Sequence, residues 1–303
     1  MSPAELPPEF RDEPFLVAEA RRAGLTRARL GGRDLARPFR GLRVAGNAPA
    51  SVRELCGAYV ARMPPTHVFS HLTAASLHGM PLPQWALADR RLHVTVPASN
   101  RPPQMRGIVG HQLRGLQMDV ELLGGLPVTS PIQTWFDLGS LLYRDDLVAA
   151  ADFLCAGREP RYTPFELRAA ATRLVGRRGC RRLREAASIA RARVDSAKET
   201  EVRLLLVDAG LPEPVVNLEL TDAAGRFVAR VDLAWSDWRV CIEYEGDGHR
   251  TDRAQFRTDI TRRERVEDLG WRMIRVTDDD LQNGGRELLR RVRAALAGRG
   301  WRG

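Results

Sequence analysis

The chain has 303 residues, a length typical of two domains or of three small ones. Its 44% apolar and 28% charged residues are typical of a folded globular protein and exclude an intrinsically disordered one. No run of about eighteen apolar residues occurs, and residues 1–15 are acidic and proline-rich where a signal peptide would be basic and then apolar. We therefore expect a cytoplasmic protein without a membrane partner.

The charge balance favours an acidic partner, because the net charge is +9 and strongly basic proteins commonly bind polyanions such as DNA. Lys198 is the only lysine, so the basic residues are almost all arginines, which the codon bias of a GC-rich genome explains as well as selection for phosphate contacts does. The cysteines occur singly, so we expect reduced, buried thiols rather than structural zinc ligands. They are Cys56, Cys155, Cys180 and Cys241.

Residues 15–46 have the pattern of two short helices followed by a hairpin. Leu16, Ala20 and Ala23 share one helical face, Gly24 breaks the helix, and Thr26 can cap a second, basic helix. This is a helix-turn-helix pattern, with RPFRGLRVA as the wing, although a plain three-helix scaffold can look the same. The arginines expected to meet DNA here are Arg27, Arg29, Arg33 and Arg40.

The middle of the chain, residues 50–158, predicts a helix ended by Gly79 and Pro81, a strand over 92–97 and a helix beginning near Ser130. Most of the histidines lie here. His67 and His71 are four residues apart, but no acid accompanies them as a metalloprotease motif would require. We expect each histidine of this region to be a hydrogen-bonded structural residue: His67, His71, His78, His93 and His111.

Residues 159–195 form a strongly basic connector. Between residues 173 and 193 the only acid is Glu185, so the charge is one-sided where a solvated helix face would mix signs. A solvated face remains the alternative, but we favour a surface that tracks phosphates. The residues that we expect to contact phosphate are Arg177, Arg178 and Arg181.

From residue 196 the order is helix, three strands, helix, strand, helix, which predicts a compact α/β or α+β domain. The segment VDLAWSDWRVCIEYEGDGHR, residues 231–250, reads as a hairpin with Ser236 and Asp237 as a two-residue loop. That register pairs Asp232 with Cys241, and Arg230 with Glu243. The residues expected on one face are Asp232, Cys241, Glu243 and Glu245, while those expected in the core are Val231, Leu233, Ile242 and Tyr244.

Asp232 and Glu243 are diagonal neighbours in this register, roughly 7 Å apart at the backbone. Both carboxylates can therefore coordinate one divalent cation such as Mg²⁺ or Mn²⁺. Three acids on one face repel one another unless a cation or arginines neutralise them. The alternative is a cross-strand ion pair between Arg230 and Glu243.

These residues resemble a known family. An ET pair in a helix, then VDLAW, IEYEG followed by histidine, a DxxRR helix and GWRMIRVT are similar to the domain family related to the very-short-patch-repair (Vsr) endonucleases, within the PD-(D/E)XK nuclease superfamily. The likeness covers about residues 195–297. It implies a restriction-endonuclease-like fold, with Asp232 as the central metal-binding aspartate and Glu243 near the second acidic position.

Some residues of this segment depart from the family motif, and others fit two roles. Glu245 stands where the family motif has lysine, so His249 or Glu245 would assist proton transfer. Glu199 resembles the helix acid that many of these nucleases add to the metal site, but Ser196 and Glu199 also fit a capping box. Asp259, Arg262 and Arg263 look like the helix beside the site, where arginines hold phosphate, and a solvated face is the alternative.

The front portion, residues 10–158, carries FLVAEARRAGLTRARL, PFRGLRV, HLTAASLHGMPLP and PVTSPIQTWFDLG, and resembles the AbiEi-type antitoxins of type IV toxin-antitoxin systems. That resemblance implies a winged helix-turn-helix, a second α/β domain and sequence-directed DNA binding through residues 26–33.

Together these expectations describe a multidomain α/β (α+β) protein: a winged helix-turn-helix over 1–48, an AbiEi-like α/β domain over 49–158, an Arg-rich connector over 159–195 and a restriction-endonuclease-like domain over 196–303. The expected function is DNA binding with Mg²⁺-dependent endonuclease activity. The alternative is a non-catalytic, antitoxin-like regulator with a degenerate nuclease fold, and a cognate toxin or a second copy of the chain is a candidate partner.

Overall fold

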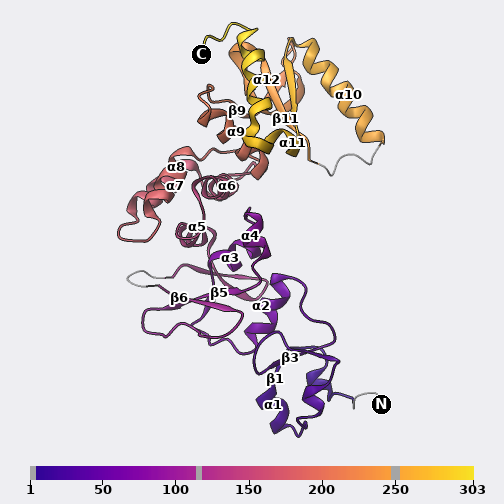
Figure 1. Cartoon of the computed structure of the whole chain (residues 1–303), viewed down its shortest axis with the longest axis vertical. Coiled ribbons are helices and arrows are strands. Elements are labelled where there is room, and N and C mark those ends of the chain that lie inside the picture. Colours follow the sequence, from indigo (N-terminus) through magenta and orange to yellow (C-terminus); the bar gives the residue numbers. More distant parts are fainter. Residues whose placement is uncertain (1–4, 114–117, 247–252) are drawn as a thin grey trace. The chain divides into compact units, whose positions relative to one another are not determined.

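The computed structural model describes residues 5–113, 118–246 and 253–303, and the side chains of all of these except residues 253–260. The chain divides into two compact units, Met1–Leu142 and Tyr143–Gly303, which are described separately (Figure 1). Each unit combines helices with β-sheet, so the multidomain α+β class is confirmed at this level. Within the described ranges, no helix has the length and apolar character needed to cross a membrane.

The N-terminal part of the first unit is a small sheet in the order β1-β3-β2, and its antiparallel β2–β3 pair is the predicted hairpin. The prediction of a helix after Thr26 is wrong, because only a 3-10 turn, η2, forms there. Leu30 is buried, but Gly31 and Gly32 follow it, so neither an apolar face nor helix-favouring residues extend the turn. The elements are β1 (Phe15–Leu16), α1 (Val17–Arg22), η2 (Arg29–Gly31), β2 (Leu35–Ala36) and β3 (Leu42–Ala45).

A five-stranded sheet in the order β6-β5-β4-β8-β7 forms the rest of the first unit. Gly79, with a φ of 73°, ends α3 in the left-handed conformation, and Ser130 caps α5 by accepting the Gln133 N–H at 3.3 Å. The predicted helix, strand and second helix of this region are therefore confirmed. The elements are α2 (Val52–Val60), β4 (Val68–Phe69), α3 (His71–His78), α4 (Gln84–Ala88), β5 (Leu92–Pro97), β6 (Ile108–Leu113), β7 (Val120–Leu123), β8 (Leu126–Thr129) and α5 (Pro131–Leu138).

Three helices open the second unit: α6 (Arg144–Leu154), α7 (Pro164–Arg173) and α8 (Cys180–Ile189). Asp152 of α6 and Arg203 of α9 form an ion pair at 2.9 Å, and both side chains are only 1% exposed. Asp152 also accepts hydrogen bonds from Thr200 Oγ1 at 2.8 Å and from the Arg191 main-chain N–H at 2.7 Å. These contacts join the Arg-rich segment to α9. The boundary between the units falls inside the segment 49–158 that we expected to be one domain, and the four-part division stays a prediction.

The predicted order of helix, three strands, helix, strand and helix is confirmed in the remainder of this unit. The sheet runs β12-β11-β10-β9, with β11 and β12 parallel and the other pairs antiparallel. Leu233 and Ile242 pack toward α9 and α12, whereas Ala234 and Cys241 pack with Val266 of α10 on the opposite face (Figure 1). The elements are α9 (Ala197–Asp208), β9 (Val215–Thr221), β10 (Phe227–Trp235), β11 (Val240–Tyr244), α10 (Arg253–Asp268), β12 (Arg272–Val276), α11 (Asp278–Leu281) and α12 (Arg286–Ala297).

The predicted register of the β10–β11 hairpin is wrong by two residues. Trp235 pairs with Val240 rather than with Trp238. A 3-10 turn over Ser236–Trp238 and Arg239, whose φ is 49°, make a four-residue loop. A shift of two residues preserves strand parity, so Asp232 and Glu243 still share a face. Continuing the observed register places them directly opposite each other instead of diagonally.

Candidate functional site

Asp232 and Glu243 lie on the sheet face that α10 covers. Asp232 Oδ2 accepts the main-chain N–H of Tyr244 at 2.8 Å, which holds this carboxylate at the point where β10 and β11 meet. Burial raises the pKa of Asp232. Burial likewise raises the pKa of Glu243 to about 7, with the Arg262 charge opposing the shift and Asp232 and Glu245 adding to it. Two adjacent strands therefore bring together two half-buried acids that repel each other.

Glu199, near the start of α9, is a third acid of this site. It is 6% exposed, and its Oε2 accepts the Asp195 N–H at 3.1 Å and Asn217 Nδ2 at 2.7 Å. Burial, followed by the negative charge of Asp232, raises the pKa of Glu199. Ser196 Oγ accepts the Glu199 N–H at 3.2 Å, so the predicted helix cap is present, but the carboxylate bonds to the residue before the cap. Glu199 thus has a structural contact and also interacts with Asp232.

Asn217 on β9 is a site residue that the sequence did not indicate. It is 3% exposed and adopts a φ of 48°, a left-handed conformation that is uncommon for a residue within a strand. Its Nδ2 group donates to Glu199 and also to the Arg193 carbonyl at 2.7 Å. The Asn217 side chain therefore holds the Glu199 carboxylate beside β9.

The acids of this face have arginine partners. Arg262 of α10 pairs with Glu243, and Arg275 of β12 pairs with Glu245. The alternative of a cross-strand Arg230–Glu243 pair is not what the structure has, because Arg230 pairs with Asp195 and Glu243 with Arg262. In this arrangement, guanidinium groups supply the positive charge next to the predicted metal ligands.

The single lysine has its own acidic partners. Lys198 Nζ lies 3.0 Å from Glu201 and 2.7 Å from Asp278, and these contacts raise its pKa although burial opposes them. His249 lies outside the described residues, and so does the side chain of Asp259. Of the predicted proton-transfer residues, Glu245 is therefore the one that the structure locates.

A pocket beside the site is lined largely by arginines. It lies between α10, β12 and α12, and Arg275, the partner of Glu245, is part of its wall. Arg263, predicted to hold phosphate, also lines it and pairs with Glu267 at 2.8 Å. The arginines that line the pocket are Arg263, Arg272, Arg275, Arg290 and Arg291.

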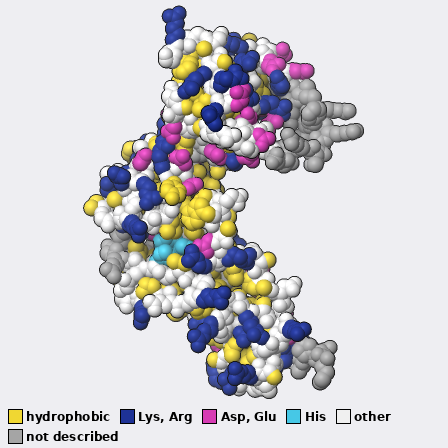
Figure 2. Space-filling view, in the orientation of Figure 1, with side chains coloured by type: hydrophobic (Ala, Val, Ile, Leu, Met, Phe, Trp, Pro, Cys, Tyr) yellow, Lys and Arg dark blue, Asp and Glu magenta, His cyan; other side chains and the backbone are white. Residues whose placement is uncertain are grey.

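The predicted DNA-contacting arginines divide into two groups. Arg29 is occupied, because it forms a bidentate pair with Asp34 at 2.7 and 3.1 Å and is 10% exposed. Figure 2 shows Lys and Arg side chains over the visible face of the N-terminal elements, where acids are sparse. Arg177 is half-buried. The exposed members of the predicted set are Arg27, Arg33, Arg40, Arg178 and Arg181.

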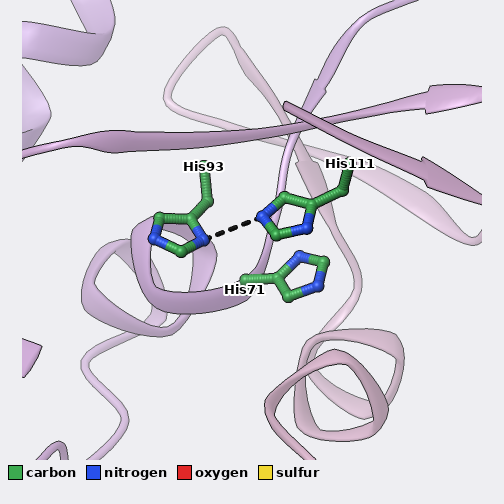
Figure 3. Close-up of side chains that lie close together, drawn as sticks. All are labelled: His71, His93 and His111. Carbon is green, nitrogen blue, oxygen red and sulfur yellow. Dashed lines mark hydrogen bonds between the residues drawn. The ribbon is translucent and has the colours of Figure 1, made fainter. Parts of the chain in front are cut away.

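A second cluster was missed by the sequence interpretation. His71, His93 and His111 come from the start of α3, from β5 and from β6, and their side chains point toward one another (Figure 3). One potential ligand atom from each lies within 4.8 Å of the others, and among the described residues this is the one group of three His, Cys, Asp or Glu residues that does so. The three strand and helix positions are far apart in sequence, so only the topology of the sheet could have revealed the cluster.

The fold and these sites define a multidomain α/β protein with a half-buried pair of carboxylates on adjacent strands. No model of a known protein family matches the chain. Two proteins of Mycobacterium tuberculosis, named Uncharacterized protein MT2308 and Uncharacterized protein Rv2248, are each 30% identical to it over 231 residues, which cover 75% of this chain and 82% of the relative. The chain belongs to the same family as these two mycobacterial proteins.

Proposed function

We propose that the protein binds DNA and that its second unit hydrolyses DNA phosphodiester bonds with Mg²⁺ or Mn²⁺. One observation carries the proposal: Asp232 and Glu243 share a face of adjacent strands, on the side of α10, and each has a raised pKa. The ionised forms of carboxylates that repel each other away from solvent are stabilised when a cation binds between them. The order of elements from α9 to α12 agrees with the restriction-endonuclease-like fold that the Vsr-related resemblance implies.

The donor set fits Mg²⁺. This cation keeps several waters and is commonly bound by one or two carboxylates together with substrate phosphate, so the Asp232 and Glu243 carboxylates suffice as protein ligands. When bound, the cation would polarise the scissile phosphate and lower the pKa of the attacking water.

The neighbouring residues would position the reacting groups. Glu199, held by Asn217 and the Asp195 N–H, fixes the negative field on one side of Asp232. Arg262 pairs with Glu243, and a bound phosphate would offer this guanidinium an alternative partner. In the proposal, Glu245 or His249 accepts a proton from the attacking water, and of these two residues the structure describes Glu245.

Several basic surfaces would hold the DNA backbone. The arginine-lined pocket adjoins the acid site through Arg275, and it can accept a phosphate by bidentate hydrogen bonds. Exposed Arg178 and Arg181 of the second unit extend the positive surface. In the first unit, Arg27, Arg33 and Arg40 would contact DNA from a winged-helix-like module, as the AbiEi-type resemblance implies.

The second candidate function is a non-catalytic DNA-binding regulator. The pairing of Arg262 with Glu243 and of Arg275 with Glu245 favours it, because arginines neutralise acids that an active nuclease would use for a cation. In that case the protein binds DNA through its arginines and does not cut it.

Plasmid nicking separates the two functions. Full-length protein is incubated with supercoiled plasmid and Mg²⁺ or Mn²⁺, beside the Asp232→Asn variant and an Asp237→Asn control at an exposed loop position of the same hairpin. The proposal predicts metal-dependent nicking by the wild type and by Asp237→Asn but not by Asp232→Asn. Intact plasmid together with a salt-sensitive gel shift would support the regulator instead.

A further inference from the structure

We propose that His71, His93 and His111 form a binding site for a divalent transition metal ion, with Zn²⁺ as the expected occupant. This site lies in the first unit and is independent of the proposed nuclease centre in the second. Three imidazoles and an open fourth position are a donor set that zinc takes in proteins.

The distances between the rings fit a metal site. His93 Nδ1 and His111 Nε2 face each other at 2.9 Å, and the His71 ring stacks on His111 with 3.6 Å between the ring centroids. Two ligand nitrogens on a tetrahedral zinc ion are about 3.3 Å apart, given bonds of about 2.0 Å. The facing nitrogens need to separate by a few tenths of an ångström. The rings must also rotate, because His71 and His111 stack at an interplanar angle of 13° and their in-plane lone pairs do not yet converge on one cation.

The surroundings of His93 also suit a metal ligand. His93 Nε2 is buried and has no hydrogen-bond partner within the described part of the chain. With its proton on Nε2, His93 presents its Nδ1 lone pair to His111 Nε2 and accepts a hydrogen bond there, and a cation would replace that proton as the shared partner of the two nitrogens.

The surroundings of His71 resemble the support of a ligating histidine. Asp137 of α5 is 4% exposed, and its Oδ2 lies 3.8 Å from His71 Nδ1. Ser70 Oγ lies 3.0 Å from the same nitrogen. Ligating histidines commonly have a carboxylate or another oxygen beside their second ring nitrogen, which fixes the tautomer and leaves the other nitrogen for the metal.

The backbone at His71 is unusual. Its φ is 50°, in the left-handed region that disfavours non-glycine residues, yet the residue begins α3. Such strain persists where the surrounding structure requires a particular side-chain direction, and here that direction is toward His111.

An entry path is visible. His111 is only half-buried, and Figure 2 shows histidine side chains reaching the visible surface of the molecule. A metal ion can therefore reach the cluster from solvent, as a site of this kind requires.

Metal titration of the full-length protein tests the site. The protein is stripped with a chelator, dialysed, and titrated with Co²⁺, followed by displacement with Zn²⁺ and elemental analysis. We expect the visible absorption bands of four-coordinate Co²⁺ and one Zn²⁺ bound per chain at this site. His93→Gln and His111→Gln should abolish the bands, Asp137→Asn should weaken binding by about 10–100-fold, and His67→Gln, a buried histidine outside the cluster, should leave the bands unchanged.

Two further measurements keep the result clear. Asp232→Asn should retain the bands, because its carboxylate belongs to the other unit. If the histidine variants fail to fold by circular dichroism, X-ray absorption of the zinc-loaded wild type should show imidazole nitrogen ligands. The proposal is overturned if the wild type gives no Co²⁺ bands, if His93→Gln gives the same bands, or if the X-ray absorption shows coordination without imidazole.

Discussion

Two acid environments in the second unit have opposite character. Asp152 is fully enclosed but has Arg203, Thr200 and the Arg191 N–H as partners, so its charge serves to join α6 to α9. Asp232 lies close to Glu243 and to Glu199, and its charge raises the pKa of both, while Arg262 pairs with Glu243. A buried acid that has cationic and hydrogen-bonding partners indicates a structural role, whereas an acid whose charge raises the pKa of its neighbours indicates a place for a cation.

The largest expected effect on stability is at Asp152. Asp152→Ala leaves the buried Arg203 without this partner, so the free energy of unfolding should fall by about 3–5 kcal/mol. Urea denaturation followed by circular dichroism measures the change. Asp208→Asn is the matched control, since the half-exposed Asp208–Arg144 pair should contribute no more than about 1 kcal/mol. Equal effects of the two variants would remove the distinction between structural and exposed acids.

Asp232→Asn should affect activity strongly and stability little, the opposite of Asp152→Ala. Asparagine keeps an oxygen that can accept the Tyr244 N–H, and loss of the charge relieves the repulsion with Glu199, so stability should stay the same or rise. Nicking should fall by about 10²–10³-fold, the range seen when a charge-stabilising group is removed from an active site. Parallel melting and nicking assays measure both properties. A large drop in melting temperature would assign Asp232 to the structural class with Asp152.

The raised pKa of Glu243, which burial mainly causes and the charges of Asp232 and Glu245 increase, should appear as a pH dependence of stability. The pKa of Glu243 is raised from 4.5 to about 7, so between these values the folded state binds more protons than the unfolded state. The free energy of unfolding should therefore decrease as pH rises through this window, by up to about 3 kcal/mol from this group. Glu243→Gln should flatten that decrease, and Mg²⁺ should oppose it in the wild type. Equal pH profiles of the two proteins would contradict the proposed repulsion.

The smallest expected effect concerns DNA affinity. Replacing Arg178 and Arg181 with glutamine should reduce the slope of log K against log salt by about 2, because each phosphate contact contributes about 0.9. Gel-shift titrations at several salt concentrations measure the slope. Arg226→Gln is the control, as that arginine is 80% exposed but pairs with Asp222. An unchanged slope in the double variant would exclude this part of the surface.

The carboxylate site was predictable because strand parity tolerates an error of two residues. The sequence placed Asp232 and Glu243 on one face even though the loop, with Arg239 in a left-handed conformation, is longer than predicted. The arginine partners were not predictable, since Arg262 and Arg275 lie on a helix and a strand that reach Glu243 and Glu245 only through the tertiary fold.

The histidine cluster could not be predicted from the sequence. Spacing along the chain directed attention to His67 and His71, whereas the fold joins His71 to His93 and His111 across α3 and two parallel strands. The prediction of a second N-terminal helix was wrong for a local reason: Gly31 and Gly32 end the turn before an apolar face can form.

The most direct test of the central claim is the nicking rate of supercoiled plasmid by Asp232→Asn and His93→Gln measured beside the wild type in Mg²⁺ or Mn²⁺. The account predicts that Asp232→Asn nicks about 10²–10³-fold more slowly than the wild type and that His93→Gln, whose altered site is in the other unit, retains the wild-type rate. Nicking by Asp232→Asn at the wild-type rate, or no metal-dependent nicking by the wild type, would contradict it.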